Sequence, residues 1–251
     1  MKTCYVKTSF YFTYVFLITT GTITFIESLR NTTPQIRHIM NLETCISIVA
    51  GYFYGVFLKE IDDAEKETEI MDKGNNDRCN GFDSRNVKET EKIEENGTLL
   101  PISKINTMRY SDWVITTPLM ILGLSILLGY ENKIGIKVSS LFLLFAFNFL
   151  MLLSGYFGEI GKISRLSGTI AGFIFFFLLF GTIWKLFMTG SKVTSQSKLV
   201  FWLYFGIWSL YGVFYQTNEL TKMIGYNILD LCAKAFIGLF FWLYLAKIVK
   251  L

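Results

Sequence analysis

The chain is poor in proline and, outside one stretch, poor in acidic residues. Only 3 of its 251 residues are proline, and 13 of the 20 aspartates and glutamates lie between Glu60 and Glu95. Hydrophobic residues make up 52% of the chain and aromatic residues 17%. This composition excludes a disordered chain and disfavours an ordinary soluble domain. The net charge of +4 averages an acidic stretch with a mildly basic remainder, so it calls for no nucleic-acid partner.

Seven apolar runs are each long enough to cross a hydrocarbon core of about 30 Å as a helix. They lack the strict alternation of barrel strands, so we expect helices. The first run exceeds the apolar core of a secretory signal and offers no small-residue cleavage site, which predicts a retained helix. The sequence therefore predicts an all-α, integral multi-pass membrane protein with one seven-helix domain over residues 1–251. The runs are Thr8–Ile26, His38–Leu58, Tyr110–Tyr130, Val138–Gly158, Leu166–Trp184, Leu199–Asn218 and Met223–Ala246.

Basic residues in the short connections predict the orientation of the bundle. They gather on one side of the membrane, which the positive-inside bias assigns to the cytoplasm. The N-terminus is then expected outside and the C-terminus in the cytoplasm. The basic residues concerned are Arg30, Arg37, Lys133, Lys137, Lys185, Lys192, Lys198, Lys247 and Lys250.

A charged insertion at about 60–104 separates the second run from the third. Blocks of alternating charge such as KETEKIEE, together with several glycines and asparagines, predict a flexible or weakly structured external loop. Within it, Asn96-Gly97-Thr98 is a candidate glycosylation acceptor. A disulfide between Cys4 and Cys79 is compatible with an oxidising exterior but is not the favoured interpretation.

Four ionisable residues lie inside the apolar runs: Glu43, Asp112, Asp230 and Lys234. Each such group costs on the order of 3 kcal/mol at a helix centre and therefore needs an explanation. Lys234 falls near the midplane, Asp230 precedes it by four residues on the same helix face, and Arg109 stands one turn outside Asp112. One interpretation is a buried ion pair that sets helix register. The other is a desolvated amine that forms a Schiff base with a carbonyl compound.

The surroundings of Asp112 favour a ligand. In the stretch MRYSDWVITTPLM, Asp112, Thr116 and Thr117 share a helix face, and Pro118 removes a backbone hydrogen bond and can kink the helix. An aromatic stripe is more often plain core. Next to a midplane lysine and two carboxylates, it favours a slot for a flat apolar ligand. The aromatic residues are Trp113, Trp208, Tyr211 and Tyr215.

The segments RYSDWVITTP and LDLCAK resemble the signature segments of microbial (type 1) rhodopsins, which are seven-helix retinal proteins. GYFGE and the dipeptide Tyr226-Asn227 are similar to the proteorhodopsin-like branch, and the short connection after the sixth run is similar to viral rhodopsins. The resemblance implies all-trans retinal bound to Lys234 as a protonated Schiff base. It also implies that Asp112 is the counterion and proton acceptor, Asp230 the second counterion and Arg109 a gate. The implied retinal pocket comprises Trp113, Thr116, Thr117, Met120, Met151, Gly155, Trp208, Tyr211, Tyr215 and Tyr54.

One departure from the family pattern concerns the proton donor. Outward pumps of this family usually carry a carboxylate eleven residues inward of the acceptor, where this chain has Gly123. If Tyr54 aligns with the family's retinal-level tyrosine, Glu43 lies about 16 Å of helix inward of it, at the depth of Gly123. Glu43 is therefore a candidate proton donor. The alternative is an acidic residue at a helix end that pairs with Arg37 or His38.

The resemblance implies a light-driven outward proton pump in a lipid bilayer, not an enzyme, with no metal site. The alternatives are a light-gated cation channel and, less favoured, a photosensor that acts through a separate transducer. Against the channel, the run ISIVAGYFYGVF after Glu43 contains no second acid. Relatives form trimers or pentamers, so a homo-oligomer is expected. Gly172 is a further, weaker candidate, as a lateral opening that admits a carotenoid antenna.

Overall fold

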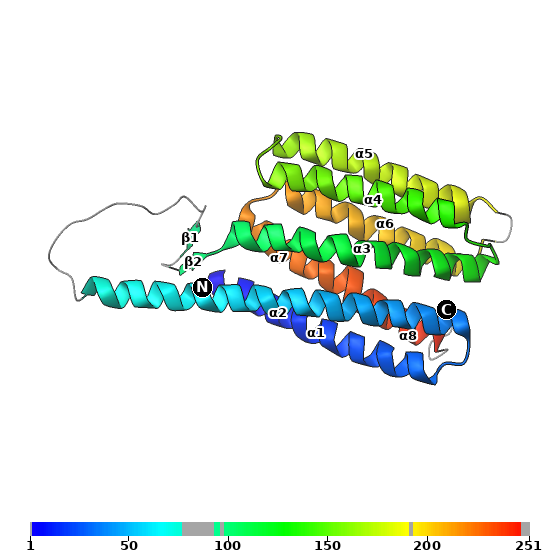
Figure 1. Cartoon of the computed structure of the whole chain (residues 1–251), viewed down its shortest axis with the longest axis horizontal. Coiled ribbons are helices and arrows are strands. Elements are labelled where there is room, and N and C mark those ends of the chain that lie inside the picture. Colours follow the sequence, from blue (N-terminus) through cyan, green and yellow to red (C-terminus); the bar gives the residue numbers. More distant parts are fainter. Residues whose placement is uncertain (1, 77–92, 96–97, 191–192, 247–251) are drawn as a thin grey trace.

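A computed structural model describes residues 2–76, 93–95, 98–190 and 193–246 of the chain. Within these residues it contains seven helical rods long and apolar enough to cross a membrane, which confirms the predicted seven-helix bundle (Figure 1). Two rods include a widened π-helical turn, η1 or η2. The elements are α1 (Lys2–Arg30), α2 (Pro34–Asn76), α3 (Ile102–Asn132), α4 (Val138–Glu159), α5 (Arg165–Ile183), η1 (Trp184–Met188), α6 (Ser195–Tyr215), α7 (Glu219–Asp230), η2 (Leu231–Phe236) and α8 (Ile237–Leu245).

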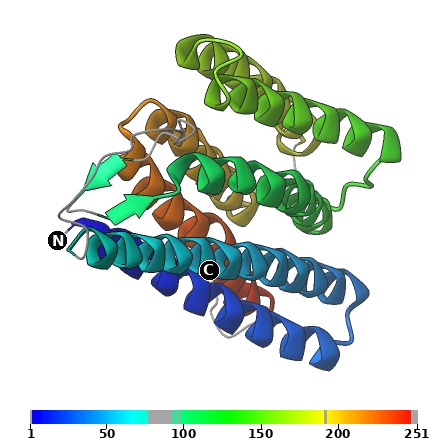
Figure 2. The ribbon, with the colours of Figure 1, turned by 60° about the vertical axis from the view of Figure 1, so that its left-hand side comes forward.

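The rods pack largely in sequence order. α1 packs against α2, α2 against α3, and α4 against α5, while the rod formed by α7, η2 and α8 contacts both α1 and α6 and so closes the bundle (Figure 2). α1 begins at the end of the bundle that carries a small β-hairpin, and α8 ends at the opposite end (Figure 1). We call these the outer end and the inner end, after the orientation expected from the basic residues.

The first part of the charged insertion is helical, so the expected external loop is wrong for this part. α2 continues to Asn76, and the short strands β1 (Ile93–Glu95) and β2 (Thr98–Leu100) pair antiparallel before α3 begins at Ile102. Asn96 and Gly97 of the glycosylation triplet and Cys79 lie outside the described residues.

Tertiary contacts explain why the helix continues past the apolar run. Ile61 is fully buried in a cluster that includes Ile102 of α3. Lys7 of α1 lies 2.7 Å from Asp62 and 2.5 Å from Glu65, and a similar ion pair joins Lys104 to Glu60 at 2.7 Å. These contacts hold the first turns of the extension against the bundle.

Candidate functional site

Four charged side chains meet in the middle of the bundle, and each of these residues is at most 1% exposed: Arg109, Asp112, Asp230 and Lys234. Lys234 Nζ lies 2.5 Å from Asp112 Oδ2 and 3.3 Å from Asp230 Oδ1. On the outer side, Arg109 Nη1 lies 3.4 Å from Asp230 Oδ2. Two cations and two carboxylates form a neutral cluster, which offsets much of the cost of burying each charge.

Lys234 lies in η2, the widened turn between α7 and α8. Such π-helical turns interrupt the regular ladder of backbone hydrogen bonds and occur frequently at functional sites. Here Thr20 of α1 donates a hydrogen bond from its hydroxyl to the carbonyl oxygen of Ala235, at 3.3 Å. A side chain from a neighbouring helix therefore supports the backbone of this turn beside the lysine.

The two carboxylates have different hydrogen-bond partners. Asp230 Oδ1 accepts from the Tyr211 hydroxyl at 2.8 Å and from Trp113 Nε1 at 3.4 Å, and its Oδ2 accepts from the Tyr54 hydroxyl at 2.9 Å. Asp112 bonds to Lys234 through Oδ2, whereas its Oδ1 has no hydrogen-bond partner among the described residues. Protonation of Asp230 would weaken several hydrogen bonds to a charged acceptor, which are the stronger kind. Protonation of Asp112 would disturb fewer hydrogen bonds, because Lys234 is its one side-chain donor among the described residues.

Arg109 links this cluster to the outer half of the bundle. Its Nη2 donates to Asn227 Oδ1, and its Nη1 donates to the Tyr54 hydroxyl at 3.2 Å. The guanidinium lies 5.1 Å from the centre of the Phe10 ring, a distance suited to a cation–π contact. Asn227 in turn donates to Ser9 Oγ at 2.7 Å. The sequence analysis assigned no role to Asn227, although a side-chain amide inside an apolar run indicates a buried hydrogen-bond partner.

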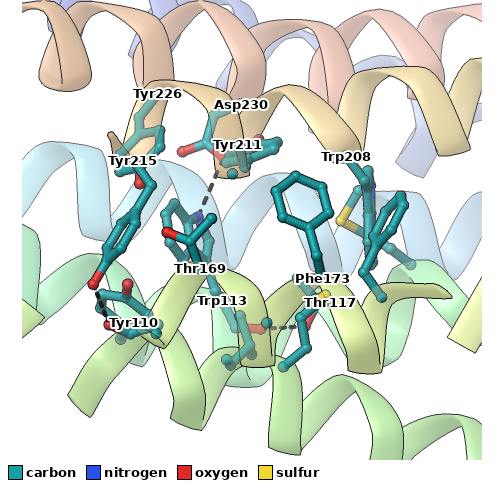
Figure 3. Close-up of a pocket in the computed structure, with 18 of the residues that line it drawn as sticks. Tyr110, Trp113, Thr117, Thr169, Phe173, Trp208, Tyr211, Tyr215, Tyr226 and Asp230 are labelled. Atoms are coloured by element: carbon teal, nitrogen blue, oxygen red, sulfur yellow. Dashed lines mark hydrogen bonds between the residues drawn. The ribbon is translucent and has the colours of Figure 1, made fainter. Parts of the chain in front are cut away.

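An apolar cavity extends from Lys234 and Asp230 between α3, α4, α5 and α6 (Figure 3). Its walls are mostly apolar and aromatic, as in the ligand sites of many proteins. Most of the predicted pocket residues line it: Trp113, Thr117, Met120, Met151, Gly155, Trp208, Tyr211 and Tyr215. The lining residues that the prediction missed are Tyr110, Leu152, Gly168, Thr169, Phe173, Phe176, Gly212 and Tyr226.

Two predicted pocket residues lie behind the cavity wall. Thr116 donates its hydroxyl hydrogen bond to the backbone oxygen of Asp112 at 2.9 Å, and Tyr54 bonds to Asp230 from the side away from the cavity lining. Tyr54 therefore positions the Asp230 carboxylate, whereas Thr116 bonds to the backbone of its own helix. The polar wall residue Thr117 accepts a hydrogen bond from Asn148 Nδ2 at 2.8 Å, so α4 also contributes a polar side chain.

Glycines shape the far end of the cavity. A Cβ atom on Gly212 of α6 would lie 2.6 Å from the Phe173 ring, so the absence of a side chain there makes room for that ring. Gly172 lines the cavity, and a Cβ atom there would approach Met151 O at 3.8 Å. Space therefore remains at Gly172, and the carotenoid antenna stays a prediction.

Glu43 is 1% exposed and points into the inner half of the bundle. A Cβ atom on Gly123 of α3 would lie 3.7 Å from Glu43 Oε1, and one on Gly238 of α8 would lie 3.1 Å from Oε2. The carboxyl group thus occupies the space beside two glycines, one of which is the position where the family usually has its donor. Arg37 and His38, the alternative partners, are exposed, whereas Glu43 faces inward.

Comparison with known proteins identifies the family. The family model described as bacteriorhodopsin-like protein matches residues 6–248. The chain belongs to this family. Members of this bacteriorhodopsin-like family carry a retinal chromophore and act as light-driven transporters or as sensors, not as enzymes. The protein is therefore a microbial rhodopsin and an integral multi-pass membrane protein.

Individual relatives support this assignment. The structure of the viral rhodopsin OLPVRII is 38% identical, covers 98% of this chain and 99% of that chain, and has a TM-score of 0.78. The light-driven proton pump LR (Mac) from Leptosphaeria maculans is 16% identical, with 96% of each chain covered and a TM-score of 0.69, and shares the fold. Opsin-1 of Neurospora crassa is 33% identical over 158 residues, which make up 55% of this chain and 48% of Opsin-1. The matched part thus spans about half the length of this curated relative.

The residues present fit a retinal. The amine of Lys234 stands at the polar end of an apolar cavity with aromatic walls, as a covalently bound polyene requires. A cationic nitrogen at that position is balanced by Asp112 and Asp230, with Arg109 neutralising the second carboxylate. In the part of the chain that the structure describes, no three histidine, cysteine, aspartate or glutamate side chains lie together in a way that could hold a metal ion.

Proposed function

We propose that this rhodopsin is a light-driven pump that moves protons outward, with all-trans retinal linked covalently to Lys234. The observation that carries the proposal is the difference between the two carboxylates. Asp112 is 2.5 Å from Lys234 Nζ and keeps one oxygen without a partner, whereas Asp230 is held by Tyr54, Tyr211 and Trp113. One carboxylate is therefore suited to accept a proton and the other to remain charged.

The bound retinal would supply light absorption and an isomerisation that changes the surroundings of the Lys234 nitrogen. Asp112 Oδ2 then accepts the proton from that nitrogen across the 2.5 Å contact. Asp230 keeps its negative charge because its hydrogen bonds favour the ionised form. Once Asp112 is neutral, Arg109 is left with Asp230 as its near anion, and the connected side chains of Arg109, Tyr54 and Asn227 lead toward the outer end.

Glu43 returns a proton to the Lys234 nitrogen from the inner side. A charged carboxylate that is 1% exposed and lacks a partner on Oε1 is strongly disfavoured, so burial favours the protonated form at rest. Gly238, which borders Glu43, lies one helical turn beyond Lys234 in the chain. The donor and the acceptor of the proton thus lie on opposite sides of the lysine, and this arrangement supports transport in one direction.

The test is a light-induced pH measurement in cells that express the chain and receive all-trans retinal. Illumination should acidify the medium, and a protonophore or Asp112→Asn should abolish the signal. Lys234→Arg is the matched control, because it keeps the positive charge but should yield no pigment. A passive current that reverses with the cation gradient would instead indicate the light-gated channel and would refute the pump.

A further inference from the structure

Two buried hydroxyl groups near Glu43 have no assigned role in this proton path. Ser47 follows Glu43 by one turn of α2 on the same helix face and is fully buried. Tyr204 of α6 is 2% exposed, and its ring stacks on Phe241 of α8 with the ring centres 6.3 Å apart. Phe241 follows by three residues Gly238, which borders Glu43 Oε2. Neither Ser47 Oγ nor the Tyr204 hydroxyl has a hydrogen-bond partner among the described residues, and the same holds for Glu43 Oε1.

The inner half differs in this respect from the outer half. On the outer side of Lys234, the side chains of Arg109, Tyr54 and Asn227 bond directly to one another. On the inner side, Glu43, Ser47 and Tyr204 present polar atoms that do not bond to other residues in the described part of the chain. A buried polar group without a partner costs about 1–3 kcal/mol, and proteins usually satisfy such groups with internal water. Three such groups in the inner half of the bundle offer the two to four partners that a buried water needs.

The length of the inner path also requires an intermediate carrier. Glu43 lies beside Gly123, which is about 16 Å of helix from Asp112, and Lys234 Nζ is next to Asp112. The gap between Glu43 and the Lys234 nitrogen is therefore far longer than a hydrogen bond of about 2.7–3.2 Å. Ser47 stands about 6 Å farther along α2 toward the depth of Lys234.

Ser47 faces the interior of the bundle, where such a carrier must lie. The helix face that holds Glu43 and Ser47 continues to Tyr54, whose hydroxyl reaches Asp230, so this face looks toward the centre of the bundle. On the side of α1, a Cβ atom on Gly21 would lie 3.2 Å from Ser47 Cβ, so the glycine avoids crowding the serine.

We propose that Ser47 and Tyr204 position the water that carries the proton from Glu43 to the Lys234 nitrogen. This proposal rests on the proposed pump function and on Glu43 as donor. The Glu43 carboxyl gives its proton to a water, which passes one of its own protons toward the Lys234 nitrogen. The water is regenerated, the nitrogen gains one proton and Glu43 is left as a carboxylate. Ser47 and Tyr204 are positioning residues, because their hydroxyls orient the water and are unchanged at the end.

The test uses flash photolysis of the full chain with retinal in lipid vesicles. Ser47→Ala and Tyr204→Phe each remove one hydroxyl and nearly preserve the shape of the side chain. Each should slow the return of the proton to the Lys234 nitrogen severalfold, while the visible absorption maximum and the rate of proton transfer to Asp112 stay at the wild-type values. Infrared difference spectra should show the carbonyl stretch of protonated Glu43 at higher frequency, because its hydrogen bonding is weaker. Ser47→Thr keeps the hydroxyl and should retain the wild-type rate.

Ser125→Ala is the matched control. Ser125 is also fully buried with a hydroxyl that has no partner among the described residues, but it follows Gly123 by two positions, about 200° around α3, and so faces away from Glu43. It should leave the rate unchanged, and equal slowing in this variant would overturn the proposal by showing a general packing effect.

Further variants separate this inference from the proposed function. If Glu43→Gln slows the proton return while Ser47→Ala and Tyr204→Phe do not, the inference is wrong and the pump with its donor stands. If Glu43→Gln has the wild-type rate, the donor assignment and the inference are both wrong. A chain that forms no pigment with retinal would overturn the proposed function itself.

Discussion

Lys222 is the buried cation of a second charged cluster, at the outer end of the bundle. Its Nζ lies 2.8 Å and 3.0 Å from the two carboxylate oxygens of Glu159 and 2.8 Å from Glu219 Oε2. Asn106 of α3 also donates to Glu159 Oε1, at 2.8 Å. The Lys222 side chain is fully buried and Glu159 is 8% exposed, so the cluster joins α3, α4 and α7 with little contact to solvent.

We predict that Lys222→Met strongly destabilises the fold. The substitution keeps the length of the side chain but removes the charge that compensates Glu159 and Glu219. Loss of one partner of a buried ion pair costs about 3–5 kcal/mol. The lower end applies here, because Glu219 is 21% exposed and keeps Arg165 Nη2 at 2.6 Å. If the unfolding barrier falls by about 3 kcal/mol, the rate of unfolding rises on the order of 100-fold.

The assay is the half-life of the detergent-solubilised protein at a fixed elevated temperature, followed by size-exclusion chromatography of samples taken over time. A half-life is the appropriate measure because membrane proteins commonly unfold irreversibly. Arg165→Met is the control, because this arginine side chain is 37% exposed and its ion pair contributes only about 0–1 kcal/mol. Equal half-lives for the two variants would refute the reasoning, since the Lys222 cluster would then behave as a solvated surface pair.

Three further predictions concern the site. Glu43→Gln should keep the visible absorption maximum and slow the proton return to the Lys234 nitrogen severalfold in flash photolysis. Adding Gly123→Asp should restore much of the rate, because the new carboxyl group would lie in the same space. A double variant as slow as the single one would contradict this. Asp230→Asn leaves Arg109 without its buried anion and should destabilise the protein by about 3–5 kcal/mol in the heating assay. A loss below about 1 kcal/mol would contradict a buried ion pair between Arg109 and Asp230. Gly212→Ala should lower the stability of the fold by about 1–3 kcal/mol, because the new methyl group crowds Phe173. The loss should be smaller in a Phe173→Leu background, and additive losses would exclude that contact.

The number of helices and the depth of a residue in the membrane could be predicted from the sequence, because both depend on hydropathy and residue spacing within one helix. Hydropathy locates the seven rods, and counting residues along a helix placed Glu43 and Gly123 at one depth, where the structure brings them together. The i, i+4 spacing likewise placed Asp230 beside Lys234, and their polar atoms lie 3.3 Å apart.

The extension of α2 and the details of the cavity wall could not be predicted in the same way. The apolar signal ends at Leu58, whereas the extension is held by contacts that α1 and α3 supply, such as the ion pair between Lys7 and Asp62. The position of Tyr54 behind Asp230 and the insertion of Phe173 beside Gly212 depend on how each helix is rotated against its neighbours. Residue spacing within a single helix carries no information on that rotation.

Because α2 is long, a probe placed outside the membrane could measure movement of the part of this helix that lies inside it. Its 43 residues form a helix about 65 Å long, roughly twice the thickness of the hydrocarbon core. The last part of α2, beyond its contacts with α1 and α3, is therefore expected to project from the membrane as a rod continuous with the helix that carries Glu43. A spin label or fluorophore fixed to this rod would report every tilt or turn of that helix during illumination, without any modification of the residues that handle the proton.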